Sequence, residues 1–182
     1  QPHRGLPAMF VMMNGARLGV GNQSLGLTEV AYQNAVTYAK DRVQSRPVDG
    51  SVKGAATIVH HPDVRRMLLT MKAFAEGNRA MLYFAAKQVD VMQRSQDEEQ
   101  RKAADAMLAF LTPIAKAFMT EVGFEAANHG VQIYGGHGFI AEWGMEQNVR
   151  DSRISCLYEG TTGIQALDLL GQVIGIYAGK SG

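Results

Sequence analysis

The spacing of hydrophobic residues predicts that most of this chain is helical. Apolar residues recur at intervals of three and four in three long segments, over about residues 8–43, 62–94 and 99–134. A shorter segment of the same kind covers about residues 162–177, and a brief helix is expected over residues 144–149. No segment alternates apolar and polar residues as a half-buried strand does. We therefore expect an all-α, antiparallel four-helix-bundle-like domain with three long helices and a shorter C-terminal helix.

Proline and glycine mark the ends of these segments. Residues 45–59 are rich in turn formers and predict a loop, and Pro62 suits the first position of the second helix. Pro113 should bend the third helix, and Gly135–Gly136 should stop it. The predicted apolar face of that third helix consists of Ala104, Met107, Leu111, Ile114, Phe118, Val122 and Ala126.

Composition narrows the class of protein. The 182 residues are enough for one domain over residues 1–182, and 46% of them are hydrophobic, as in globular proteins. Eighteen basic and 17 acidic residues nearly cancel, which gives no reason to expect nucleic acid as a partner. Cys156 is the single cysteine, which fits a reducing, cytoplasmic location. No apolar run is expected to span a membrane, and Gln1 is not a natural start, so we expect a part of a longer polypeptide.

The sequence gives little support for a metal site or for a phosphate-binding site. A di-iron bundle needs paired Glu-x-x-His motifs, whereas this chain offers only Glu125 and His129, four residues apart, so we predict no metal site. Gly135, Gly136 and Gly138 could cradle a phosphate through backbone N–H groups, but glycine pairs also end many helices. No lysine follows them as in a P-loop.

The stretch Tyr-Glu-Gly-Thr-Thr-Gly over residues 158–163 is the most informative part of the chain. It sets the carboxylate of Glu159 directly before a turn and an apolar helix, where a general base can be aimed at a ligand. The alternative is an ordinary helix start capped by Thr161 or Thr162, with Glu159 favoured by the helix dipole. Local physics alone favours the cap.

Several motifs together resemble a known family. They occur in a fixed order and at specific separations, and the first long helix also fits. The motifs are residues 132–139 (Gln-Ile-Tyr-Gly-Gly-His-Gly-Phe), Glu142, Glu146, Arg150–Asp151 and residues 158–162 (Tyr-Glu-Gly-Thr-Thr). With them, the sequence resembles the C-terminal helical domain of the FAD-dependent acyl-CoA dehydrogenases, and residues 12–19 look similar to the larger members that include methylthiopropanoyl-CoA dehydrogenases.

This resemblance implies a reaction and roles for particular residues. Glu159 would remove the α-proton of an acyl-CoA thioester while the β-hydride passes to the flavin, and its backbone N–H would help hold the thioester carbonyl. Arg17 would lie near the acyl-CoA, and Thr161 would contact the flavin. Without the resemblance, Arg17 is simply a solvated charge on a helix.

The resemblance also implies contacts between subunits. Arg42, Gln44, Gln132, Gly135 and Gly136 would contact the FAD of a neighbouring subunit, so a homo-oligomer, a dimer or tetramer, is expected. Electrons would leave for an electron-transfer flavoprotein.

Departures from the family pattern qualify the expectation. Ser45–Arg46 stand where the family often has Phe-Gly, Gly144 stands where it has proline, and Gly163 replaces a common glutamine or glutamate. The family's N-terminal helical and middle β-domains have no counterpart in these residues, so this chain alone is not expected to turn over substrate. Two other hypotheses stay open: an acyl-CoA oxidase that passes electrons to oxygen, and a helical oligomerisation module without catalysis.

Overall fold

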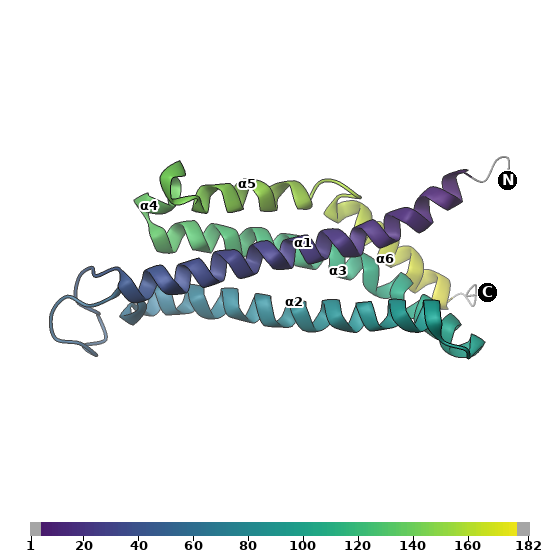
Figure 1. The fold of residues 1–182 in the computed structure, drawn as a ribbon, viewed down its shortest axis with the longest axis horizontal. Helices are drawn as coiled ribbons and strands as arrows, with labels where there is room; N and C mark the ends of the chain where they lie inside the picture. The colour runs from purple at the N-terminus through teal and green to yellow at the C-terminus, as the bar shows by residue number, and fades with distance from the viewer. Residues whose placement is uncertain (1–4, 178–182) are drawn as a thin grey trace.

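A computed structural model describes residues 5–177 of the protein, apart from the side chains of Pro7, Val11, Ile176 and Tyr177. Within this part, helices dominate and the only β-type pairing is an isolated bridge between Val43 and Thr57. The elements, in order, are α1 (Gly5–Asp41), η1 (Ile58–His60), α2 (Pro62–Arg94), α3 (Glu98–Tyr134), α4 (Gly136–Phe139), η2 (Ala141–Trp143), α5 (Met145–Ser155) and α6 (Thr162–Tyr177) (Figure 1). The all-α prediction is confirmed.

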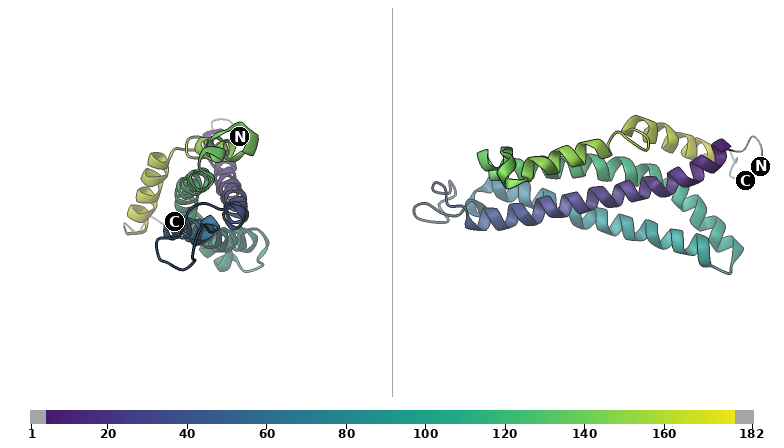
Figure 2. Two further views of the ribbon diagram at one scale, coloured as in Figure 1. Left: turned by 90° about the vertical axis from the view of Figure 1, so that its left-hand side faces the viewer. Right: turned by 45° about the horizontal axis from the view of Figure 1, so that its top comes forward.

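The three long helices run side by side and alternate in direction (Figures 1 and 2). Helix α3 packs against α1, α2, α5 and α6, so it forms the centre of the domain. Helix α5 lies along α1 and α3 and is longer than the predicted 144–149 segment. The fourth position of the bundle is thus occupied first by α5 and then by α6, which packs on α3.

Small residues let α1 and α3 approach closely. Ala31, Ala35 and Ala39 are fully buried on α1 and pack in one cluster with Met71 of α2. Gly123 of α3 faces α1 so closely that an added Cβ would collide with the Ser24 side chain. The Ser24 hydroxyl donates a hydrogen bond to the Met119 carbonyl at 2.7 Å, which joins the two helices through a buried polar contact.

The buried face of α3 differs from the predicted one. Met107 and Phe118 are 40% and 50% exposed, so the prediction that they belong to the core face is wrong. Their place is taken by a polar row at intervals of four, Thr112, Lys116 and Thr120, all of which are buried. The apolar period identified the helix correctly but misplaced its buried face by part of a turn.

Helix α3 also corrects the expectation about membrane-spanning runs. Among the described residues it contains an 18-residue window with a mean hydropathy of 1.3, apolar enough by length and composition to cross a membrane. Half of that window is buried inside the bundle, as in the core helix of a folded domain.

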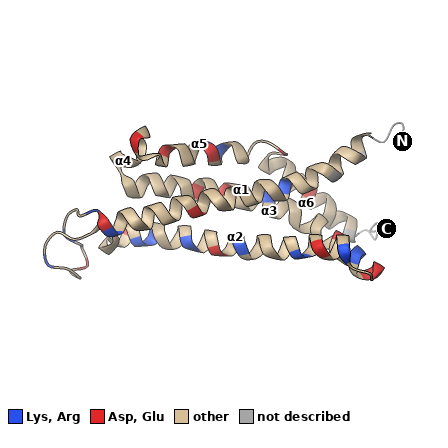
Figure 3. Ribbon diagram, in the orientation of Figure 1, with Lys and Arg blue, Asp and Glu red and all other residues tan. Residues whose placement is uncertain are grey.

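Helix α3 contains Pro113 and its ribbon changes direction part-way along (Figure 2). Basic residues outnumber acidic ones along α2, and the two signs are mixed along its length (Figure 3).

Candidate functional site

The predicted site residues fall into two groups at the two ends of α5. We call the segment between α5 and α6, residues 156–161, the base turn; it holds Glu159 and Thr161 and contacts Arg17. The other group surrounds the end of α3, just before α5, and we call it the glycine pocket. Eleven residues of α5 separate the two groups along the chain, a helix length of roughly 16 Å.

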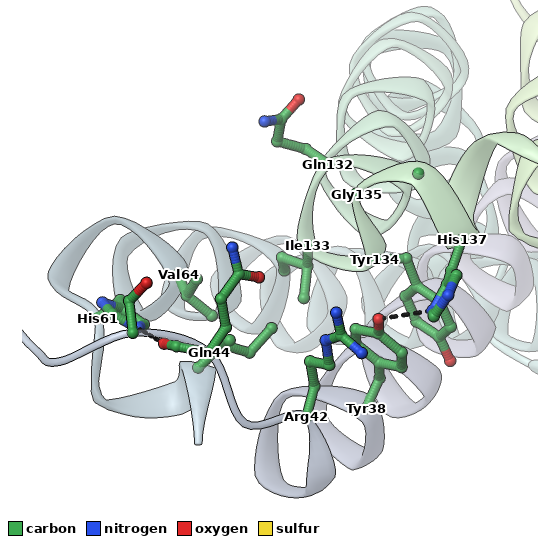
Figure 4. Close-up of a pocket in the computed structure, with 13 residues that line it drawn as sticks. Tyr38, Arg42, Gln44, His61, Val64, Gln132, Ile133, Tyr134, Gly135 and His137 are labelled. Carbon is green, nitrogen blue, oxygen red and sulfur yellow. Dashed lines mark hydrogen bonds between the residues drawn. The ribbon is translucent and has the colours of Figure 1, made fainter. Parts of the chain in front are cut away.

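The glycine pocket is a cavity of about 620 Å³ formed by the end of α1, the start of α2 and the end of α3 (Figure 4). It brings together all the residues for which the family resemblance implies a contact with the FAD of another subunit. The lining residues are Tyr38, Arg42, Gln44, Ser45, Ile58, His61, Val64, Gln132, Ile133, Tyr134, Gly135, Gly136 and His137.

A short extended segment after α1 fixes the direction of two of these side chains. Gln44 N–H donates to the Ala56 carbonyl at 3.0 Å, and Ile58 N–H donates to the Arg42 carbonyl at 2.8 Å. Because side chains alternate along an extended segment, Arg42 and Gln44 share one face. The intervening loop, residues 45–56, therefore serves to hold this segment beside the start of α2.

Histidine 61 makes a different contact from the one expected of a helix cap. It occupies the residue before α2, but its side chain caps no backbone N–H of that helix. Instead, its Nε2 atom lies 2.7 Å from the Gln44 carbonyl oxygen. This contact joins the start of α2 to the extended segment and forms one wall of the glycine pocket (Figure 4).

Aromatic rings form another wall of the pocket. Tyr38 stacks on Tyr134 with centroids 4.0 Å apart, and His137 stacks on Trp143 at 4.7 Å. The Tyr38 hydroxyl and His137 Nδ1 are 2.9 Å apart, which links the two stacks (Figure 4). Burial raises the pKa of the Tyr134 hydroxyl, and the neighbouring Tyr38 raises it further. The other histidine near the end of α3, His129, does not line the pocket. Its Nε2 atom lies 3.5 Å from Glu125 Oε1 on the same helix.

The end of α3 turns sharply at the glycines. Gly135 has φ 59° and ψ −135°, a conformation that side chains strongly disfavour. The helix stops there as predicted, but Gly136 begins the single turn of α4 rather than a loop. A Cβ on Gly138 would lie 2.8 Å from Tyr134 Cβ and would also collide with the Val131 carbonyl. The glycines thus allow the chain to fold back closely over the end of α3.

The base turn has an unusual backbone. Glu159 has a positive φ of 56°, and Gly160 follows with φ 94°. For a residue other than glycine, the left-handed region costs about 1 kcal/mol, so other contacts must hold Glu159 there. The Thr161 hydroxyl accepts a hydrogen bond from the Ile164 N–H at 3.4 Å, which matches the helix-cap role considered for it.

Three buried side chains hold the two carbonyls of this strained segment. Arg17 Nε donates to the Glu159 carbonyl at 3.2 Å, and Gln165 Nε2 lies 3.3 Å from the carbonyls of both Glu159 and Gly160. Lys116 Nζ donates to the Gly160 carbonyl at 2.6 Å. Arg17 is 4% exposed, Lys116 0% and Gln165 1%, so the alternative of Arg17 as a solvated helix charge is wrong.

Arg17 and Lys116, the two cations that contact the base turn, differ in whether a carboxylate balances their charge. Arg17 forms an ion pair with Asp168 of α6 at 2.7 Å. Lys116 has no ion-pair partner in the described part of the chain, and burial lowers the pKa of its ammonium group. A buried ammonium with only neutral oxygens as close partners is costly, so a specific reason for its presence is required.

We call Arg17, Lys116 and Gln165 the clamp. The clamp contacts the backbone of the base turn from its carbonyl side and leaves the N–H side without a contact from these residues. In a trans peptide the carbonyl and the N–H point in opposite directions, so the N–H groups of Gly160 and Thr161 face away from the buried donors. Within residues 5–177, no protein acceptor contacts these two N–H groups or that of Glu159. The partly exposed Glu159 carboxylate likewise has no hydrogen-bond partner there. A carboxylate beside free backbone donors can remove a proton and stabilise the anion that results.

Sequence reasoning missed Lys116, Gln165 and Asp168 in this cluster. Lys116 could have been found from the spacing of four that it shares with Thr112 and Thr120 on α3. Such a row of polar residues on a helix with an apolar core face indicates a buried polar contact. No comparable local signal marks Gln165 or Asp168. Within the part of the chain that the structure describes, no cluster of three potential metal ligands is found.

Comparison with known proteins identifies the family. The family described as "Acyl-CoA dehydrogenase, C-terminal domain" matches residues 3–174, nearly the whole chain. The chain belongs to the acyl-CoA dehydrogenase family.

Individual relatives of this acyl-CoA dehydrogenase domain agree. The chain is 51% identical over 174 residues to the 3-methylmercaptopropionyl-CoA dehydrogenase of Ruegeria pomeroyi, covering 96% of this chain and 29% of that protein. It is 36% identical over 169 residues to a butyryl-CoA dehydrogenase of Syntrophomonas wolfei, covering 93% and 28%. The chain thus spans less than a third of the length of these relatives, and the expected similarity to methylthiopropanoyl-CoA dehydrogenases is confirmed.

A solved structure shows the same arrangement of helices. The acyl-CoA dehydrogenase of Bacillus anthracis, complexed with FAD, superimposes with a TM-score of 0.79 at 27% identity. The superposition covers 94% of this chain and 29% of that protein. The bundle of this acyl-CoA dehydrogenase domain is therefore shared with a flavin-binding relative.

Proposed function

We propose that this domain belongs to an FAD-dependent acyl-CoA dehydrogenase that forms an α,β-double bond in an acyl-CoA thioester, with Glu159 as the base. The observation that carries the proposal is the base turn. There, within residues 5–177, a carboxylate without a protein partner stands next to three backbone N–H groups without a protein acceptor, and buried side chains hold the intervening carbonyls. Family membership supplies the reaction, and the geometry of the turn supports the role of the residue.

The proposed chemistry needs both the Glu159 carboxylate and the free N–H groups of the base turn. The Glu159 carboxylate takes the α-proton of the thioester, and the pair of electrons left behind forms the double bond as the β-hydrogen departs as hydride. Bound FAD would supply the acceptor for that hydride, and an electron-transfer flavoprotein would then take up the electrons. Because a thioester α-proton is weakly acidic, N–H donors aimed at the thioester oxygen are needed to stabilise the developing negative charge. The free N–H groups of the base turn suit that task.

The residues of the glycine pocket fit a phosphate-bearing flavin. Arg42 supplies a positive charge, Gln44 and Gln132 supply amide donors, and Gly135 and Gly136 leave room for close backbone approach. Since α5 separates this pocket from Glu159, we propose that each FAD lies between the base turn of one subunit and the glycine pocket of another. Thr161 and Arg17 then belong to the base-turn half, with Arg17 acting through the backbone of Glu159. The proposal requires a homo-oligomer, a dimer or tetramer.

The most similar relative cited above points to the class of substrate. It is named for 3-methylmercaptopropionyl-CoA, and a second relative for butyryl-CoA. We propose that the substrate is a short acyl-CoA, including thioether-containing chains of similar length.

The decisive experiment uses the protein at its full natural length, purified with FAD and assayed against a panel of acyl-CoA thioesters with an artificial electron acceptor. Glu159→Gln should lower kcat by about 10²–10⁴-fold while leaving FAD content unchanged, because the amide cannot accept the proton. Glu76→Gln is the matched control, because Glu76 is an exposed α2 carboxylate that pairs only with Lys72 in the part of the chain that the structure covers. Normal turnover by the Glu159→Gln protein would remove Glu159 from the base role. Peroxide release in the absence of the acceptor would identify an oxidase instead.

A further inference from the structure

The buried ammonium of Lys116 is the feature that the proposed reaction leaves unexplained. Its side chain is 0% exposed, near the middle of α3, and its Nζ atom donates a 2.6 Å hydrogen bond to the Gly160 carbonyl. No carboxylate forms an ion pair with it among the described residues. As a purely structural group it would be a poor choice, because an apolar side chain of the same length fills the space without desolvating a charge.

The position of Lys116 relative to Glu159 indicates what the contact does. The Gly160 carbonyl belongs to the peptide that follows the left-handed pair Glu159 and Gly160. A strong donor on that oxygen fixes the rotation of the peptide, while Arg17 and Gln165 fix the preceding one. With both carbonyls held inward, the strained φ of Glu159 is retained and the free N–H groups point outward.

We propose that Lys116 is a positioning residue for proton abstraction, holding the Gly160 carbonyl so that the Glu159 carboxylate and the neighbouring N–H groups keep their outward orientation. This inference rests on the function proposed above, and it adds a residue to the machinery that the family motifs do not indicate. Lys116 does not touch the substrate; it acts through the backbone of the base turn.

The first test replaces Lys116 by methionine in the FAD-loaded, full-length protein. Methionine keeps the length and the apolar stem of the side chain but removes the ammonium. Because a misplacement of about 1 Å can cost on the order of 100-fold in rate, kcat should fall at least about tenfold. The KM for the acyl-CoA should stay within about threefold, and FAD content should not change, since neither ligand is bound by Lys116.

Thr112→Val is the matched control. Thr112 lies one turn before Lys116 on the same buried row and is 4% exposed; among the described residues, its hydroxyl donates only to the Leu108 carbonyl of its own helix. Its replacement disturbs the polar core of α3 without touching the base turn, so kcat should stay within about twofold. Equal losses of kcat in the two variants would reduce Lys116 to a packing role and overturn the inference.

A second variant keeps the inference testable if Lys116→Met does not fold. Gln165→Met removes the other donor to the Gly160 carbonyl, and it should lower kcat with little change in KM, by less than Lys116→Met. Where both variants fold, their combination should lower kcat by less than the product of the single effects, because both act on one carbonyl. Unchanged kcat in Gln165→Met alongside an unfolded Lys116→Met would count against the positioning role.

A readout independent of turnover separates this inference from the proposed function. A crystal structure of the Lys116→Met protein should show Glu159 away from its φ of 56° or the Gly160 carbonyl rotated outward. An unchanged turn in that structure overturns the inference whatever the activity. Full activity of Glu159→Gln, or an inactive wild type, would refute the proposed reaction, yet the crystallographic result would still decide whether Lys116 holds the turn.

Discussion

The base turn and the glycine pocket lie at the two ends of α5, and their polar groups are used differently. Around the base turn, Arg17, Lys116 and Gln165 are buried and donate to two carbonyl oxygens of the turn, and Arg17 also pairs with Asp168. In the glycine pocket, the side chains of Arg42 and Gln132 are exposed and contact no protein acceptor within residues 5–177. The donors around the base turn already have acceptors within this chain, whereas Arg42 and Gln132 have none among the described residues and can donate to a ligand.

This difference fits the roles proposed for the two regions. The proposed proton transfer depends on the placement of one carboxylate, and the buried donors hold the backbone that carries it before any ligand arrives. The proposed cofactor site between subunits needs accessible donors, which stay hydrated until the ligand is bound. Substitutions should therefore separate the two regions by what they affect: rate in the base turn, and cofactor affinity or local folding in the pocket.

The largest effect on stability is expected from Gly138→Ala, which lies next to the pocket residue His137. The added Cβ would lie 2.9 Å from Val131 Cα as well as 2.8 Å from Tyr134 Cβ, and backbone atoms cannot move aside cheaply. We expect a loss of about 3 kcal/mol in the free energy of unfolding, measured by thermal or urea denaturation, together with loss of FAD. Gly136→Ala is the control for stability, because its Cβ meets no atom of residues 5–177 within 4 Å; it should change the free energy of unfolding by less than about 0.5 kcal/mol.

Arg42→Met should give an intermediate effect confined to the cofactor. Arg42 is exposed and carries no ion pair in the described part of the chain, so its removal should leave thermal stability of the FAD-free protein unchanged. A hydrogen bond to a charged group contributes about 1.5–3 kcal/mol, so FAD should bind about 10–100-fold more weakly, measured by fluorescence titration. Unaltered FAD affinity would show that the pocket does not face the cofactor and would break the comparison.

The smallest effect is expected midway between the two regions, where Glu29 of α1 pairs with Arg79 of α2. The hydrogen bond from Arg79 lowers the pKa of Glu29 below its ordinary value of 4.5. The ionised pair therefore stabilises the fold above about pH 4.5, and this contribution disappears as the pH falls through the lowered pKa. Glu29→Gln should cost about 0.5–1 kcal/mol at pH 7 in urea denaturation, and less below pH 4.

The same variant checks both site regions at once. Glu29 contacts neither the base turn nor the glycine pocket, so Glu29→Gln should leave kcat and FAD affinity unchanged. A change in either would show that the two regions are coupled through α1.

Much of the fold could be predicted because the spacing of apolar residues within a short segment indicates a helix. The three long helices and α6 lie close to their expected ranges, and Pro62 and Gly135 mark the ends assigned to them. The length of α5 was underestimated because its sequence is polar, and its burial depends on contacts with α1 and α3. The face of α3 was misplaced for a related reason: Phe118 is apolar yet half exposed, while Lys116 is charged yet buried.

The candidate site was predictable only in part. The motifs around Gly135 and Glu159 identified two relevant turns, and the structure gathers Arg42, Gln44 and Gln132 around the first of them. The positive φ of Glu159 and the donors that hold it carried no signal in the local sequence. Gln165 and Asp168 were invisible because helix residues of these types are usually solvated.

The sequence by itself determined the helices, their glycine and proline boundaries and the family, because each depends on residues that are close together along the chain. The tertiary structure alone decided that a lysine from α3, an arginine from α1 and a glutamine from α6 meet at one backbone turn. It also decided that Arg42 and Gln132, 90 positions apart, share one cavity. The physical reason is that burial and hydrogen-bond geometry depend on how helices pack, which no local pattern of residues specifies.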